Sequence, residues 1–279
     1  MATIIAIVNQ KGGVGKTTTA VNLATYIAQR GNYVLMMDMD PQANATSGFG
    51  IDHRSLDKGM YEAVIGAASM RDVICTTEHT GLTIAPATMQ LAGASVELVP
   101  VDGREYKLRE ALAEVRNDYD YIIIDCPPSL GLLTINSLVA SDYVLIPVQA
   151  EYYALEGLGQ LVQTIGLVRD NLDSQIGILG AVITMFDTRN RLSNQVMMEL
   201  YKYFPETIFR TVIPRSIRLA EAPSHGKSIL GYDPASKAAR SYERLAEEVL
   251  DVIERKLTQL YHPTTAAPTA AQRVHIPIA

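Results

Sequence analysis

The sequence predicts a doubly wound α/β fold, in which a mostly parallel sheet is flanked by helices. Two observations carry this prediction. Short apolar runs alternate along the chain with stretches of helical spacing. Within each run the apolar residues are continuous rather than alternating, as is typical of parallel strands that are buried on both faces. We therefore expect helices to cover both faces of one sheet.

The first run and the helix after it are the clearest elements. Residues 3–8 form a short β-branched run, and apolar residues at helical spacing follow over residues 17–30 before Gly31 ends the helix. A glycine-rich turn joins the two segments. The sequence therefore predicts a strand, a glycine-rich turn and a helix in that order.

Later segments repeat this alternation. Further strands are expected at five short apolar runs, which lie at residues 33–37, 82–85, 121–124, 143–148 and 176–184. Helical spacing returns over residues 237–260, which indicates a C-terminal helix docked on the body. We expect residues 1–260 to form a single domain, and residues 261–279, which contain three prolines, to form a disordered tail.

The composition excludes several classes of protein. The chain has 279 residues, of which 48% are hydrophobic and 19% are charged, so it is not a largely disordered chain. Cys75 and Cys126 are its only cysteines, too few for a disulfide framework or a zinc ribbon, and this usage favours the cytoplasm. No apolar run approaches the roughly 18–20 residues that cross a bilayer, so no membrane partner is expected.

The glycine-rich turn has the residue types that bind phosphate. It reads Asn9-Gln10-Lys11-Gly12-Gly13-Val14-Gly15-Lys16-Thr17-Thr18. Glycines let backbone N–H groups point at phosphate oxygens, and the N-terminus of the following helix adds its positive dipole end. Lys16 is expected to reach the β- and γ-phosphates, and the Thr17 hydroxyl to hold Mg²⁺. The common G-x-x-x-x-G-K-[ST] pattern needs glycine at position 10, whereas this chain has Gln10 and adds a second lysine, Lys11.

Two carboxylates follow predicted strands, where a metal site is expected. Asp125 ends the run at residues 121–124, and Asp40 comes shortly after the run at residues 33–37. Mg²⁺ prefers oxygen ligands and often binds them through water. We expect Asp125 to hold the Mg²⁺ shell. Asp40 either orients the attacking water or binds the metal through water, and the sequence leaves both roles open.

With these motifs in order, the chain resembles the ParA/MinD ATPases, which carry a deviant Walker A motif, and within them the chromosomal, Soj-like ParA proteins. The resemblance runs from about residue 3 to about residue 257 and is most specific at residues 9–19, 38–50, 120–137 and 210–226. It implies a P-loop ATPase with slow intrinsic turnover that uses ATP and Mg²⁺ and closes into a homodimer with ATP. Lys11 then matches the signature lysine, which reaches the partner subunit's nucleotide.

The same resemblance implies the nucleotide contacts. They are expected from the loop and from two later positions, namely Lys11, Gly12, Gly13, Val14, Gly15, Lys16, Thr17, Thr18, Met185 and Pro214. Lys11, Lys16 and Asp40 are the expected catalytic residues, and Thr17, Asp40 and Asp125 the expected metal-binding residues.

The charge distribution bears on a DNA partner. The net charge of −6 and the pI near 5.4 argue against a surface that is basic throughout. Residues 185–244, however, carry ten basic and six acidic residues, a net charge of +4. The resemblance implies that the ATP-bound dimer binds double-stranded DNA without sequence preference through Arg189 and Arg218, and next through Arg215. Arg215 follows Pro214, so a role in nucleotide binding or in the fold stays open.

A ParB-like, centromere-binding partner is expected to stimulate hydrolysis and so release the protein from the nucleoid. Two other classes of protein remain as alternatives. A membrane-surface positioning ATPase of the MinD type would favour a basic amphipathic tail, whereas this tail is proline-rich and weakly charged. A metabolic amide or ring-forming synthetase of the same fold would generally lack the signature lysine. DNA partitioning is therefore the leading hypothesis.

Overall fold

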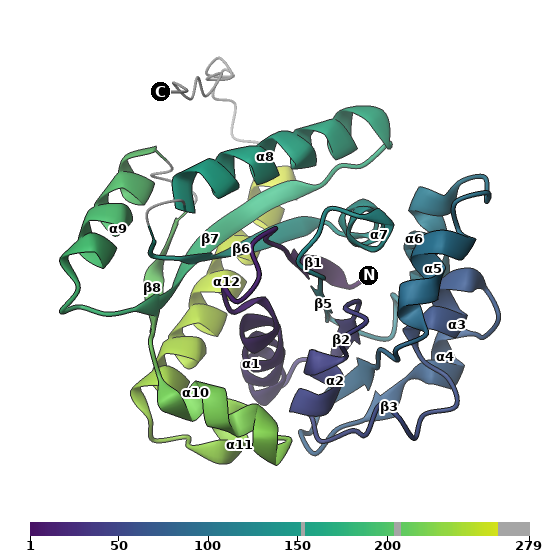
Figure 1. Ribbon diagram of the computed structural model, residues 1–279, viewed down its shortest axis with the longest axis horizontal. Coiled ribbons are helices and arrows are strands. Elements are labelled where there is room, and N and C mark those ends of the chain that lie inside the picture. Colours follow the sequence, from purple (N-terminus) through teal and green to yellow (C-terminus); the bar gives the residue numbers. More distant parts are fainter. Residues whose placement is uncertain (152–153, 204–207, 262–279) are drawn as a thin grey trace.

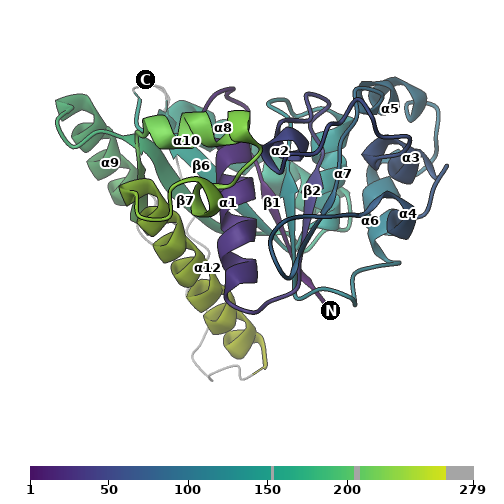
Figure 2. The same ribbon diagram turned by 90° about the horizontal axis from the view of Figure 1, so that it is seen from below.

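The computed structural model describes residues 1–151, 154–203 and 208–261, which form a twisted sheet with helices packed on both faces (Figures 1 and 2). The described part of the chain contributes eight strands, in the order β3-β4-β2-β5-β1-β6-β7-β8. Every neighbouring pair is parallel except β3 and β4. The predicted fold class is confirmed. The tail predicted at residues 261–279 lies outside the described residues, except for Tyr261, which is the last residue of α12.

The strands match the apolar runs closely. They span Thr3–Ile7 (β1), Val34–Asp38 (β2), Cys75–Thr76 (β3), Leu82–Ala85 (β4), Tyr121–Asp125 (β5), Tyr143–Gln149 (β6), Gly177–Phe186 (β7) and Ile208–Pro214 (β8). The short β3 and the edge strand β8 are absent from the sequence-based expectation. In β8, exposed Arg210 and partly exposed Thr211 interrupt the apolar run, because an edge strand keeps part of its surface in water.

The helices divide between the two faces. The longer ones are Lys16–Gln29 (α1), Leu132–Ala140 (α7), Ala154–Asn171 (α8), Arg191–Tyr203 (α9) and Lys237–Tyr261 (α12). The shorter ones are Asn44–Gly48 (α2), Met60–Ile65 (α3), Met70–Val73 (α4), Leu91–Glu97 (α5), Lys107–Leu112 (α6), Ile217–Glu221 (α10) and Ile229–Tyr232 (α11), with 3₁₀ turns at Arg104–Tyr106 (η1) and Ala222–His225 (η2). Among the described helices, none is long and apolar enough to cross a membrane.

Two hydrophobic cores lie on opposite faces of the sheet, and β1 shows why its apolar run is continuous. Ile4 and Ala6 belong to the core covered by α3 and α5–α8, whereas Ile5 and Ile7 belong to the core covered by α1 and α12. All four side chains are at most 1% exposed. A strand buried on both faces needs apolar residues at every position, which is the pattern seen in the sequence.

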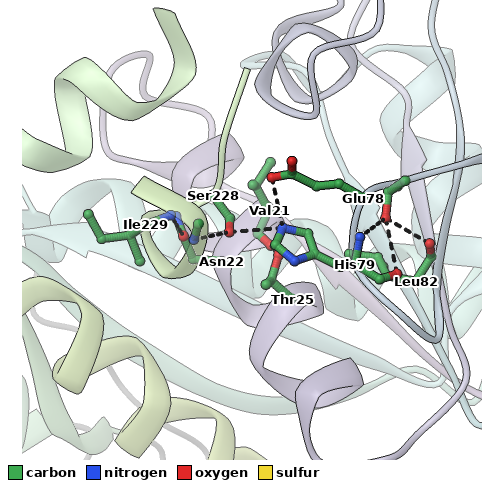
Figure 3. A network of polar contacts seen from close by, with 10 residues as sticks. Val21, Asn22, Thr25, Glu78, His79, Leu82, Ser228 and Ile229 are labelled. Atoms are coloured by element: carbon green, nitrogen blue, oxygen red, sulfur yellow. Dashed lines mark hydrogen bonds and ion pairs between the residues drawn. The ribbon is translucent and has the colours of Figure 1, made fainter. Parts of the chain in front are cut away.

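Polar contacts fix the segment around α11 against α1 (Figure 3). The backbone N–H of Ile229 donates to Asn22 Oδ1 at 2.7 Å, and Ser228 Oγ lies 3.1 Å from His79 Nε2. Asn22 belongs to α1, the helix that follows the glycine-rich loop. Burial lowers the pKa of His79, opposed by the neighbouring Glu78 carboxylate. The chain after α10 is thereby anchored to the helix that begins at the loop.

A second close contact joins α2 to η2. Gly50 and Gly226 both have left-handed backbones, with φ of 74° and 63°. A Cβ atom at Gly226 would lie 2.6 Å from the Gly50 Cα atom, which is closer than real atoms approach. The two backbones therefore touch, and only glycine fits at position 226.

Replacing Gly226 tests this contact. We expect Gly226→Ala to lower the free energy of unfolding by more than 2 kcal/mol, since the left-handed backbone alone costs an alanine roughly 1–2 kcal/mol and the clash adds to it. Gly66→Ala is the matched control, because Gly66 has φ of 79° but no heavy atom within 4 Å of the added Cβ. Urea denaturation measures both. Equal losses would show that the contact with Gly50 imposes no constraint.

Candidate active site

The candidate site lies where β1, β2 and β5 end. These three strands are adjacent in the sheet, and Asp125 pairs in register with Ile7 on one side and with Asp38 on the other. The glycine-rich loop leaves the end of β1 at the same edge and leads into α1 (Figure 2). In open parallel sheets, ligands bind at the carboxyl ends of the strands. The structure thus brings the predicted loop and the predicted carboxylates together.

The loop backbone adopts conformations that require glycine. Gly13 and Gly15 have φ of 73° and 88°. A Cβ atom at Gly12 or Gly13 would meet no heavy atom within 4 Å, so the loop backbone there is open to a ligand. Gly15 directly precedes α1, whose first N–H groups have no partner within the helix. This arrangement suits an anion such as phosphate.

Two residues that the sequence reasoning missed hold the loop in place. Thr184 Oγ1, on β7, donates to the Val14 carbonyl at 2.7 Å. Asn9 Nδ2 donates to the Pro147 carbonyl on β6 at 2.7 Å, while Asn9 Oδ1 accepts from the backbone N–H of Lys11 at 3.0 Å. The loop is therefore tied to β6 and β7. No local motif marks these two contacts with the strands, since the partners are far apart along the chain.

Lys16 is held inside the loop. Its side chain is largely buried, and its Nζ donates to the Lys11 carbonyl at 3.1 Å. Burial lowers the pKa of Lys16, and the nearby carboxylates of Asp125 and Asp40 act in the opposite direction. The ammonium group is thus placed beside both predicted carboxylates before any ligand binds.

Asp38 and Asp125 are buried side by side but differ in their partners. Asp38 accepts from the Thr46 N–H at 2.8 Å and from the Thr46 hydroxyl at 2.7 Å, and burial raises its pKa to about 6. Burial, reinforced by the Asp38 charge, raises the pKa of Asp125 well above its ordinary value, while Thr17 and Lys16 lower it. Among the described residues, neither carboxylate oxygen of Asp125 has a hydrogen-bond partner of good geometry.

This difference assigns separate roles to the two carboxylates. Asp38, which the sequence analysis gave no role, holds the start of α2 through Thr46. Asp125 keeps both oxygens available, and a buried carboxylate in that state is stabilised by a cation. Mg²⁺ fits the donors at hand, since it commonly takes one or two carboxylates and completes its shell with phosphate oxygens and water. No group of three or more His, Cys, Asp or Glu suited to a metal occurs within the described ranges.

Asp40 lies beside this pair and also shapes a turn. Its side chain is 7% exposed, and its Oδ1 accepts from the Gln42 N–H at 3.0 Å. Ala43 follows with φ of 53°, an unusual value for alanine, and directly precedes α2. The other carboxylate oxygen is compatible with either role that the sequence left open for Asp40.

Lys11 is held by a residue that the sequence did not indicate. Its Nζ forms an ion pair with the carboxylate of Glu151, just after β6, and both side chains are about half exposed. Within one chain the Lys11 ammonium is therefore neutralised. Any contact of Lys11 with a second subunit requires this pair to break.

Met185 and Pro214 come together at the ends of β7 and β8. Phe186 and Pro214 are partners in the sheet, and the Phe186 carbonyl accepts from the Arg215 N–H at 3.1 Å. Met185 has φ of 50° and directly follows Thr184, which binds the loop. The structure therefore brings both positions to the loop's side of the sheet, and their contact with a nucleotide stays a prediction.

The three predicted DNA-binding arginines follow the ends of the same two strands. Arg189 lies between β7 and α9, Arg215 comes directly after β8, and Arg218 lies on α10. The Arg189 side chain is 89% exposed and that of Arg218 is 55% exposed. Both are accessible, and each contacts carboxylates of its own chain.

The buried carboxylates make stability depend on pH. Because the pKa of Asp38 rises from 3.8 to about 6 on folding, the folded protein binds more protons than the unfolded chain between these pH values, and its stability falls as pH rises through them. The raised pKa of Asp125 acts in the same direction. We expect the stability of Asp125→Asn relative to the parent protein to increase between pH 4.5 and pH 8, because the variant lacks the carboxylate whose raised pKa makes the parent lose stability over this range. Urea denaturation without nucleotide or Mg²⁺ measures this, and a difference that stays constant with pH would contradict it.

Comparison with known proteins identifies relatives along most of the chain. A family model described as an AAA domain matches residues 2–178. The sporulation initiation inhibitor protein Soj of Bacillus subtilis is 55% identical over 249 residues, which cover 89% of this chain and 98% of that protein. The chromosome-partitioning ATPase Soj of Treponema pallidum is 47% identical over 250 residues, or 90% of this chain and 98% of that protein.

Solved structures agree in fold. Cobyrinic acid a,c-diamide synthase from Mycobacterium smegmatis, with a bound ATP analogue and magnesium, has a TM-score of 0.79 and 32% identity, covering 97% of this chain and 100% of that one. A plasmid partition protein from Borrelia burgdorferi has a TM-score of 0.69 and 29% identity, covering 91% of this chain and 99% of that one. The Soj and ParA relatives have higher identity over most of the chain, and so this chain belongs to the Soj and ParA family of chromosome-partitioning proteins.

Proposed function

We propose that this protein is a DNA-partitioning ATPase that dimerises with ATP and Mg²⁺, binds DNA without sequence preference, and leaves the DNA when ATP is hydrolysed. The observation that carries the proposal is the buried carboxylate of Asp125, whose oxygens have no hydrogen-bond partner of good geometry among the described residues and lie beside Lys16 and the open glycine-rich loop. The names of the Soj and ParA relatives support the partitioning role. Residues 1–260 act as one P-loop ATPase domain.

The loop and α1 bind the triphosphate. The N–H groups of Gly12 to Thr18 surround the phosphates, and Lys16 bonds the β- and γ-phosphate oxygens. Thr17 and Asp125 hold Mg²⁺, which neutralises charge on the phosphates. Met185 and Pro214 contact the base. Burial lowers the pKa of Lys16, and a polyanion bound beside it favours its charged form.

Asp40 orients the water that attacks the γ-phosphate. Of the three buried carboxylates at the site, Asp38 holds α2 and Asp125 ends β5, which leaves Asp40 for this role. The attacking water forms the new P–O bond, ADP leaves, and the proton passes to the released phosphate. Lys11 of the other subunit offsets the charge that spreads over the transferring group, as a cation does in related phosphoryl transfers.

DNA binding uses Arg189, Arg218 and Arg215. Residues 185–244 carry a net charge of +4, although the chain as a whole carries −6. A dimer doubles this basic surface, so pairing of subunits by ATP strengthens attraction to phosphates. A ParB-like partner stimulates the slow hydrolysis and so releases the protein from the nucleoid in the cytoplasm.

Two alternative functions have less support. A MinD-type ATPase would act on a membrane surface, and the outer face of α12 mixes acidic and basic residues rather than carrying the excess of Lys and Arg typical of interfacial helices. An amide synthetase shares the fold, as the 32% identical diamide synthase shows. The partitioning relatives are 45–55% identical over most of the chain, and these identities favour partitioning.

Co-sedimentation with plasmid DNA tests the function directly. We expect DNA binding with ATP and Mg²⁺, little with ADP or without nucleotide, and at least a tenfold loss of affinity when salt rises from 50 to 200 mM. Lys16→Ala should lose ATP-dependent binding, because the phosphates lose their buried cation. Normal ATP-dependent DNA binding by Lys16→Ala, or binding to liposomes but not to DNA, would contradict the proposal.

Asp40→Ala separates binding from hydrolysis. We expect this variant to bind ATP and DNA but to hydrolyse ATP about 100-fold more slowly, because the attacking water is no longer oriented. Asp52→Ala is the matched control, since Asp52 Oδ1 likewise accepts the N–H two residues further on, at 3.1 Å, but lies outside the site. Phosphate release in single-turnover assays measures both. Undiminished hydrolysis by Asp40→Ala, or an equal loss in Asp52→Ala, would argue against a catalytic role.

A further inference from the structure

Arg189 is engaged by a carboxylate of its own chain. Its Nε donates to Asp187 Oδ1 at 3.0 Å and its Nη2 donates to Asp187 Oδ2 at 2.9 Å. The same Oδ1 accepts the backbone N–H of Arg189 at 3.0 Å. Both oxygens of the carboxylate thus occupy the guanidinium edge that a phosphate group would bind. The arrangement is local to the exposed turn after β7.

Arg218 shows the same arrangement with different partners. Its Nη1 donates to Glu221 Oε2 at 3.1 Å, and its Nε lies 3.4 Å from Asp233 Oδ2. The Tyr232 hydroxyl donates to Glu221 Oε2 at 3.1 Å and helps to hold that carboxylate in place. Glu221 ends α10 and Asp233 follows α11, so two separate segments meet at this guanidinium.

The charges at these two places cancel locally. Two arginines face three carboxylates, Asp187, Glu221 and Asp233, so Arg189 and Arg218 are both neutralised within their own chain. Arg215 also lies close enough to Asp187 to help lower the pKa of that carboxyl to about 2, after the larger effects of Arg189. The net charge of +4 over residues 185–244 already includes these three carboxylates.

We propose that Asp187, Glu221 and Asp233 set the DNA affinity of this protein by competing with DNA phosphates for Arg189 and Arg218. The inference rests on the proposed DNA-binding function. To bind a phosphate, each guanidinium must exchange its carboxylate, and the displaced carboxylate then lies beside the incoming phosphate and repels it. Single subunits bind DNA weakly for this reason, and the doubled contacts of the dimer overcome the competition.

The size of the effect follows from the exposure of the pairs. Exposed ion pairs contribute little each, which corresponds to at most about fivefold in affinity. A dimer contains two copies of each pair, so neutralising one type of carboxylate should tighten binding by about three- to tenfold. The opposite interpretation is that the carboxylates orient the arginines toward DNA. In that case the same substitutions would weaken binding.

The test measures affinity for a random-sequence duplex by fluorescence anisotropy, with ATP and without nucleotide. Asp187→Asn and Glu221→Gln should each bind about three- to tenfold more tightly than the parent protein with ATP. Glu110→Gln is the matched control. Glu110 pairs with Lys107 at 2.8 Å on α6, which lies at the opposite side of the molecule from α10 in Figure 1. Glu110→Gln changes the net charge by the same amount as Asp187→Asn or Glu221→Gln. The control should change affinity by less than about twofold.

Further variants assign the gain to the arginines themselves. In the Arg189→Ala background, Asp187→Asn should no longer increase DNA affinity, because the guanidinium that Asp187 would release is absent. Unchanged or weaker binding by both carboxylate variants, or an equal gain in Glu110→Gln, would overturn the inference. A parent protein that does not bind DNA with ATP would instead overturn the proposed function, and the inference with it. ATP affinity and melting temperature, measured on every variant, identify effects that arise from nucleotide binding or folding.

Discussion

The buried carboxylates of Asp38 and Asp125 are the constraint on which the rest of this structure depends. They lie opposite each other on adjacent strands, out of contact with water, and next to the largely buried Lys16. The protein itself satisfies Asp38, through the N–H and hydroxyl of Thr46, but leaves Asp125 without a hydrogen-bond partner among the described residues. Burying a charge without a partner costs several kcal/mol. A cation bound here would compensate the Asp125 carboxylate, which is the role proposed above for Mg²⁺.

From this pair, packed contacts lead to the predicted DNA-binding residues. Asp38 holds α2 through Thr46, and the chain after α2 touches η2 where the backbones of Gly50 and Gly226 meet. On the other side, α1 begins at the glycine-rich loop and binds the start of α11 through Asn22. The segment from α10 to α11 carries Arg218 and its partner Glu221. It thus contacts both α1 and the chain after α2. These contacts place the α10–α11 segment next to elements that begin or end at the candidate site.

Most of the sheet could be predicted from the sequence, because strands buried on both faces must be apolar at every position, as Ile4 and Ile5 show. The loop and Asp125 could also be predicted, because glycines and an acidic residue at the end of a strand are local sequence signals. The edge strand β8 was not, because its exposed positions carry Arg210 and Thr211. The partnership of Lys11 with Glu151 and the role of Asp38 were missed for a different reason. Each depends on a contact between segments that only the folded chain brings together.

The thermal stability of the protein with different ligands tests the central claim most directly, namely that a cation held with the nucleotide compensates the Asp125 carboxylate. A ligand that binds only the folded state at 100 times its dissociation constant stabilises by about 2.7 kcal/mol. We expect a melting temperature several degrees higher with ATP and Mg²⁺ than with ATP and a chelator, and little of this difference in Asp125→Asn. Equal melting temperatures with and without Mg²⁺ in the parent protein, or an undiminished Mg²⁺ effect in Asp125→Asn, would contradict it.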